Sequence, residues 1–175
     1  MDAAGFLRLK ARRRALLAAF ATAAFASALA SAAHGQSRRE GYEPLTRIDD
    51  QRALAAQVRK QQRPLLLFFS VPGCPFCLEV RRTHLAPRML DADRGPLIRE
   101  IEISSRRTFT SFDGTTTTEY DFANSYKVRM VPRVVLVDAD FKPLAEPMIG
   151  IGVSDFYGAY LNDAIDNATR KLQGK

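Results

Sequence analysis

The chain has 175 residues, of which 46% are hydrophobic, and it carries a formal net charge of +7 with only two cysteines. This length and composition suit a single domain with a packed core. Residues 1–33 hold five basic groups and one acid, which accounts for +4 and leaves +3 on the remainder, where acids and bases are mixed. The charge therefore does not indicate a nucleic-acid-binding protein, and nucleic acid is not an expected partner.

The first segment of the chain has the order of parts found in an export signal. A basic stretch ends at Arg14, an alanine-rich apolar run covers residues 15–30, and small residues follow. This order predicts a cleaved signal peptide over residues 1–33 and a periplasmic mature protein. A membrane anchor is the alternative, but a spanning helix needs about 20 strongly apolar residues, and Thr22 and Ser27 interrupt this run.

A polar linker is expected over residues 34–47, followed by one domain over residues 48–172. The domain opens with a helical pattern from Ile48, in which apolar residues recur with the spacing of one helix face. Asp49 or Asp50 is the expected N-cap, because a short acidic side chain accepts a hydrogen bond from the first turn. The first element is therefore predicted to be an amphipathic helix.

An apolar run and the pair of cysteines follow this helix. Residues 64–69 are continuously apolar, which predicts a strand buried on both faces. Cys74 and Cys77 come at the predicted strand-to-helix junction, with Pro75 suited to the first helical turn. Unpaired N–H groups and the positive end of the helix dipole favour a thiolate there, so Cys74 is expected to be a nucleophile with a lowered pKa. Cys77, one turn further on, is placed to attack a mixed disulfide and release the partner.

Two other interpretations of the cysteine pair remain open. A structural zinc site needs four ligands, and only His34 and His84 are available to add to the two thiols. His34 lies in the N-terminal segment and His84 stands seven residues beyond the second cysteine, so no metal site is expected. Two inert cysteines are the other alternative. We favour a redox dithiol, for which no bound cofactor is expected.

The helix that starts at Pro75 is expected to end or kink at Pro87, because proline lacks the N–H of the helix ladder. Glu79 and the Arg81–Arg82 pair are predicted to form its solvated face. His84 is predicted to be a surface residue as well. The apolar positions of this helix are Phe76, Val80 and Leu85.

The remaining elements follow in a regular order. The pattern predicts a strand over residues 97–103, a loop or small hairpin over 104–118, a short helix over 119–126, a strand over 134–137, an edge strand over about 143–149 and a closing helix capped by Ser154. The closing helix is expected to carry an apolar face made of Phe156, Tyr160, Leu161, Ala164 and Ile165. Strands that alternate with helices predict an α/β fold with a central mixed β-sheet flanked by helices on both faces.

This order of elements resembles the thioredoxin-fold family over residues 49–172. The matching parts are a buried strand, Cys-Pro-Phe-Cys, a helix, a strand, a helix and then Val131-Pro132 before another strand. The resemblance implies a thioredoxin-like fold with a cis proline at Pro132 that faces the dithiol. It also implies that Val131 and Pro132 bind substrate, since the backbone beside that proline is free to pair with an extended substrate in this family. Phe76 is expected to contribute to an apolar rim that binds the substrate.

Within the family, residues 108–114 and positions in the segment 118–128 look most like the periplasmic thioredoxins of sulfur-oxidation systems. Ordinary thioredoxins instead carry a tryptophan where this chain has Gly73, and Gly-Pro where it has Pro75-Phe76. The buried acid of the family falls at Phe68, which cannot titrate. The helix terminus is then the only stabiliser of a thiolate that the sequence identifies, which favours a reducing dithiol.

The expected function is that of an exported thiol–disulfide oxidoreductase that reduces disulfide-bearing exported proteins. A membrane thiol-electron carrier is the expected source of electrons, and the protein is expected to act as a monomer. Two alternatives stay open: a thiol oxidase that donates its disulfide to folding proteins, and a thioredoxin-fold binding module without catalysis.

Overall fold

The computed structural model describes residues 45–90, 95–152 and 154–174. The predicted signal peptide (1–33) and most of the predicted linker (34–47) lie outside these ranges. Among the helices that the structure describes, none is long and apolar enough to cross a membrane.

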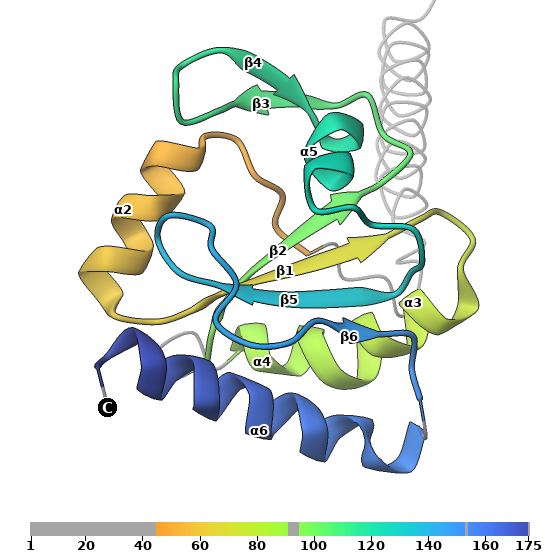
Figure 1. Cartoon of the computed structure of the whole chain (residues 1–175). Coiled ribbons are helices and arrows are strands. Elements are labelled where there is room, and N and C mark those ends of the chain that lie inside the picture. The colour runs from red at the N-terminus through yellow and green to blue at the C-terminus, as the bar shows by residue number, and fades with distance from the viewer. Residues whose placement is uncertain (1–44, 91–94, 153, 175) are drawn as a thin grey trace, which may run out of the picture. The chain divides into compact units, whose positions relative to one another are not determined.

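A mixed sheet forms the centre of the domain. Its strands are β1 (Leu65–Ser70), β2 (Leu97–Glu102), β5 (Arg133–Val137) and β6 (Met148–Ile149), in the spatial order β2-β1-β5-β6 (Figure 1). β1 runs parallel to β2 and antiparallel to β5, and β5 is antiparallel to β6. All six residues of β1 are buried, as the apolar run predicted, because β1 lies inside the sheet and helices cover both faces.

Helices form a layer on each side of this sheet. α2 (Gln51–Gln61) and α5 (Glu119–Ser125) lie on one face, and the helical segment 75–90 lies with α6 (Ser154–Leu172) on the other (Figure 1). A buried apolar cluster fills each interface between helices and sheet. The predicted α/β class with a mixed sheet between helices is confirmed. The side chain of Ser154, the predicted cap of α6, lies outside what the structure describes.

Short polar side chains start both helices of the first layer, and Asp50 is one of the two N-caps predicted for the first helix. The Asp50 carboxylate accepts a hydrogen bond from the Ala53 N–H at 2.8 Å, and the Thr118 hydroxyl accepts one from the Asp121 N–H at 3.1 Å. α2 therefore begins directly after Asp50. Ile48 precedes the helix and is buried in the core.

The polar segment after β2 forms the small hairpin that was one of its two predicted conformations. β3 (Thr108–Thr110) pairs antiparallel with β4 (Thr116–Thr118). The Asp113 carboxylate accepts hydrogen bonds from turn residues on both sides, which lower the pKa of Asp113 to about 2. Phe109 is buried against Phe122, with ring centroids 5.4 Å apart, so the hairpin is anchored on the core.

The two edges of the sheet are covered or short. At the β2 edge, the Thr46 carbonyl accepts a hydrogen bond from the Glu100 N–H at 2.9 Å, so the incoming chain lies beside the strand. At the other edge, β6 has only two residues. The edge strand predicted over 143–149 is thus shorter than expected, and Pro143 joins the sheet through an isolated bridge to Val137.

The helix that follows the cysteines does not end at Pro87. It runs as α3 (Pro75–Glu79), a π-helical turn η2 (Val80–Leu85) and α4 (Ala86–Leu90). At the end of η2 the Ala86 N–H donates to the Arg81 carbonyl, five residues back. This wider winding directly before Pro87 displaces the carbonyls that the proline ring would contact in an α-helix, so the helix continues.

The buried face of α6 agrees only in part with the predicted one: Leu161 is buried and Ala164 and Ile165 are partly buried, as predicted, but the two predicted aromatic residues are not. Phe156 and Tyr160 are 58% and 62% exposed, whereas Tyr157, Leu161 and Ala168 are buried. The last three are separated by four and seven residues, which is the spacing of one helix face. The sequence pattern allowed a buried face that begins with Phe156 or one that begins with Tyr157, because both residues are aromatic.

His84 is half-buried and does not lie free on the surface as predicted. Its ring centroid lies 4.9 Å from that of Tyr157 on α6. Gly158 on the same helix also lies against the ring, since a Cβ at this position would stand 3.4 Å from the imidazole. Burial lowers the pKa of His84, and the charge of Arg88 lowers it further.

The protein is expected to lose stability as the pH falls below about 6.5, in part through His84. The unfolded chain binds a proton at the ordinary histidine pKa, whereas the folded protein resists it, so acid favours the unfolded state. Urea denaturation midpoints at about pH 7.5 and about pH 5.5 measure the loss on either side of that value. The His84→Gln variant should lose less between the two conditions, and an equal loss would assign the effect to other groups.

Candidate redox site

The loop that carries the cysteines leaves the end of the central strand β1. Gly73 has a φ of 73°, a left-handed backbone conformation that glycine adopts without strain. Cys74 is the N-cap of α3, and Pro75 occupies the first helical turn, where its missing N–H has no intrahelical partner to lose. The short loop 71–73 therefore connects β1 to the helix, and the dithiol lies at the start of that helix.

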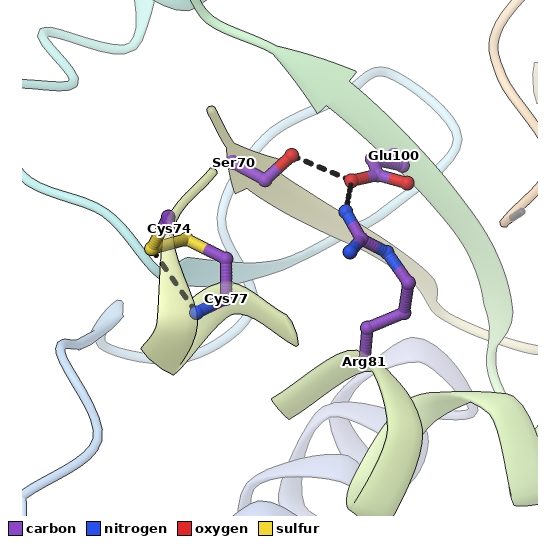
Figure 2. The surroundings of a disulfide bond; sticks show 5 residues. All are labelled: Ser70, Cys74, Cys77, Arg81 and Glu100. Atoms are coloured by element: carbon purple, nitrogen blue, oxygen red, sulfur yellow. Dashed lines mark hydrogen bonds and ion pairs between the residues drawn. A yellow bond between two sulfur atoms is a disulfide. The ribbon is translucent and has the colours of Figure 1, made fainter. Parts of the chain in front are cut away.

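Cys74 and Cys77 form a disulfide at the start of the helix, with Cα atoms 5.2 Å apart (Figure 2). The Cys77 N–H donates a hydrogen bond to Cys74 Sγ at 3.1 Å. In the reduced protein this N–H and the helix dipole favour negative charge on that sulfur. Cys74 is half-buried and Cys77 is 1% exposed, so the first sulfur is the more accessible to a partner.

The residues predicted to bind substrate lie around the same end of the sheet. The Val131–Pro132 peptide bond is cis. Because Arg133 pairs with Phe69 near the end of β1, the residues before β5 lie at the end of the sheet from which the cysteine loop leaves. Pro132 is buried, Val131 is partly buried, and Phe76 on α3 is 57% exposed.

A serine, a glutamate and an arginine form a buried polar cluster beside the disulfide (Figure 2). Glu100 on β2 is 2% exposed and accepts hydrogen bonds from the Ser70 hydroxyl, at 2.5 Å, and from the Arg81 guanidinium. Arg81 is 7% exposed and also lies over the Phe68 ring, 5.7 Å from its centroid. The prediction that Arg81 belongs to a solvated helix face is wrong, because its partner lies on a strand 19 residues further along the chain.

A cavity of about 440 Å³ adjoins both the disulfide and the polar cluster. Its lining includes Ser70, Cys74, Pro75, Leu78, Arg81 and Glu100. Sequence reasoning missed this arrangement, because an arginine in a helix and a glutamate in an alternating strand each fit an exposed position. β2 carries three charged residues among its six, so nothing in its sequence singled out Glu100 as the buried one.

The zinc alternative finds no support in the described part of the chain. His34 lies outside that part, and His84 packs against α6. Across residues 45–90, 95–152 and 154–174, no group of three or more His, Cys, Asp and Glu side chains is arranged to hold a metal ion.

The comparison with known protein families covers a segment that includes β1, the dithiol and the helix that follows it. A family model described as a thioredoxin-like domain matches residues 51–157, which is more than half of the chain. The chain belongs to the thioredoxin-like family. No curated protein matches its sequence significantly.

Solved structures similar to this thioredoxin-like chain share little sequence with it. An oxidoreductase named DsbH is 18% identical, over 76% of this chain and 92% of that chain, with a TM-score of 0.48. A thioredoxin-fold protein from Helicobacter pylori is 18% identical over 65% and 81% of the two chains, with a TM-score of 0.47. Mitochondrial thioredoxin 3 from Saccharomyces cerevisiae is 17% identical over 70% and 94%, with a TM-score of 0.47.

In this thioredoxin-like domain, Phe68 stands where the resemblance places a buried acid. The register partner of Phe68 on the neighbouring strand is Glu100. Residues paired across two strands point to the same face of a sheet, so Glu100 lies on the face where Phe68 packs with Cys77. A buried carboxylate is therefore present on that face, on β2 and not at the position of Phe68 on β1.

Proposed function

We propose that this protein is an exported thiol–disulfide oxidoreductase that reduces disulfides of partner proteins. The observation that carries the proposal is the Cys74–Cys77 pair at a helix start, with one sulfur accessible and the other buried. An accessible sulfur that accepts an N–H hydrogen bond suits the attacking thiolate. A buried sulfur within bonding reach of the first suits the resolving thiol.

The reaction consists of two thiol–disulfide exchanges. Cys74 Sγ attacks, as a thiolate, one sulfur of the partner's disulfide, so that a mixed disulfide forms and the other partner sulfur leaves as a thiolate. The Cys77 thiol then loses its proton and attacks Cys74 Sγ, which releases the second partner sulfur and leaves the Cys74–Cys77 disulfide. The two released thiolates take up protons, and two electrons have passed from the dithiol to the partner.

The partner is proposed to be a protein segment that lies along the cysteine loop. Phe76 and Met130 are 57% and 61% exposed, on α3 and on the loop that precedes the cis proline. Large apolar side chains left exposed near a reactive sulfur favour a macromolecular substrate. We assign the contact with the partner to Phe76 and to the Val131–Pro132 backbone.

The proposed direction is reduction in the periplasm, with a membrane thiol-electron carrier as the source of electrons. The support is the likeness of the hairpin and α5, residues 108–128, to the periplasmic thioredoxins of sulfur-oxidation systems. Donation of the disulfide to folding proteins is the opposite direction. Dithiols in this fold span about −270 to −120 mV, so the reduction potential distinguishes the two.

Insulin reduction tests the proposal. The purified protein with excess dithiothreitol is expected to accelerate the precipitation of insulin, and the Cys74→Ser variant is expected to match the rate without protein, because serine forms no disulfide. A wild-type protein without effect would overturn the proposed activity on protein disulfides. Equilibration with glutathione then gives the potential: a midpoint near about −270 mV supports the reductant, and one near about −120 mV assigns the oxidase direction.

A further inference from the structure

We propose that the buried Arg81–Glu100 ion pair sets the stability of the Cys74 thiolate, and with it the potential of the dithiol. Arg81 and Glu100 are then positioning residues, which act on the reacting sulfur through their charges without touching the partner. The inference rests on the proposed function, since it takes Cys74 to be the attacking thiol. It can be tested without any partner, because the thiolate is a property of the reduced protein.

The ion pair and the sulfur share one cavity. Arg81, Glu100 and Cys74 all contribute to its lining, and the two charged side chains are 7% and 2% exposed. Buried charges are screened far less than exposed ones. At an effective protein dielectric constant of about 20, a unit charge about 10 Å away shifts a pKa by about one unit.

The other charged groups around the cavity are paired or exposed. Glu102 also lines it, but its side chain is 29% exposed and lies 3.7 Å from Arg47. Arg133 at the start of β5 donates instead to the Lys127 carbonyl at 3.3 Å. On the neighbouring helices and loops, the exposed charged side chains, whose effects solvent screens, are Glu79, Arg82, Arg129 and Asp155.

The two members of the pair act on Cys74 in opposite directions. The guanidinium of Arg81 favours the thiolate, and the carboxylate of Glu100 disfavours it. The sequence identified the helix terminus as the only stabiliser, but the structure adds a positive charge together with the negative charge that balances it. A buried ion pair adds little stability over apolar residues of equal volume, so a contribution to stability does not by itself account for this pair.

Opposite shifts in the Cys74 pKa are the expected result of removing each charge in turn. Glu100→Gln keeps an acceptor for Ser70 and Arg81 but leaves the guanidinium unbalanced, so the pKa should fall by about one unit. Arg81→Met removes the positive charge and should raise it. The double variant lacks both charges and should return close to the wild-type value. The pH dependence of the alkylation rate of Cys74 in the reduced protein measures each pKa.

Two control variants separate charge from structure. Arg82→Met removes the same charge from the exposed neighbouring residue and should leave the Cys74 pKa unchanged. Arg81→Lys keeps the charge but loses the guanidinium, and it should stay near the wild-type value. Circular dichroism verifies the fold of each variant. If Arg81→Met does not fold, the fall of the Cys74 pKa in Glu100→Gln and its return to the wild-type value in the double variant still test the proposal.

The potential should follow the thiolate. At a pH above the Cys74 pKa, a tenfold change in thiolate stability moves the potential by about 30 mV, so Glu100→Gln should be more oxidising and Arg81→Met more reducing. Shifts of the same sign in both single variants, or no shift in either, would overturn the inference. Failure of insulin reduction with the opposite shifts intact would remove the proposed function and leave the charge effect standing.

Discussion

Replacement of Cys77 by serine is expected to convert the protein into a covalent trap for its substrate. The variant still has the accessible Cys74 sulfur, so the first exchange forms a mixed disulfide as before. The intramolecular attack that normally breaks this bond is lost. A well-oriented neighbouring group can act at an effective concentration on the order of 10⁵ M, so external thiol at about 10⁻³ M should release the partner up to about 10⁸-fold more slowly.

Non-reducing gels of the reduced variant mixed with insulin should show an adduct that disappears on treatment with dithiothreitol. The matched control is Cys74→Ser, which keeps the buried Cys77 and should form no adduct. An adduct on Cys74→Ser and none on Cys77→Ser would reverse the roles assigned to the two cysteines.

Replacement of Phe69 by alanine is expected to destabilise the domain by about 3–5 kcal/mol, because it empties a large site in a close-packed core. Phe69 is fully buried, and its ring centroid lies 6.4 Å from that of Phe122 and 5.6 Å from that of Tyr126. For a domain of this size, such a loss lowers the melting temperature by roughly 10–20 °C. Thermal unfolding followed by circular dichroism measures it.

The matched control is Phe156→Ala, which removes the same side chain from an exposed position of α6. It is expected to change the free energy of unfolding by no more than about 0.5 kcal/mol. Similar losses in the two variants would contradict the assignment of Phe69 to the core and of Phe156 to the surface.

Local signals in the sequence predicted most of the fold. The apolar run over 64–69 has only one stable environment, a strand covered on both faces, and it forms β1. Asp50 and Thr118 start helices because their side chains accept hydrogen bonds within the next turn, which requires no knowledge of the rest of the chain. The position of the cysteine pair at the start of a helix was likewise predicted from adjacent residues, namely the apolar run before it and Pro75.

Features that depend on distant partners were not predictable in the same way. Arg81 directly precedes the exposed Arg82 in its helix, and its burial follows only from Glu100 on a strand that comes later in the chain. Tyr157 and Phe156 are neighbours of similar character, and the orientation of α6 on the sheet decides which is buried. The polar cluster beside the dithiol could therefore not be predicted from the sequence, because its three members come from β1, β2 and η2, which are in contact only in the folded protein.

The covered edges of the sheet bear on how the protein behaves when it is concentrated. An open strand edge offers a row of backbone donors and acceptors on which a strand of another molecule can add. Here the chain at Thr46 already occupies the middle of the β2 edge, and β6 is too short to template a partner. Strand-on-strand aggregation is thus disfavoured at both edges of the central sheet, so the protein is expected to stay free of such aggregates when it is concentrated.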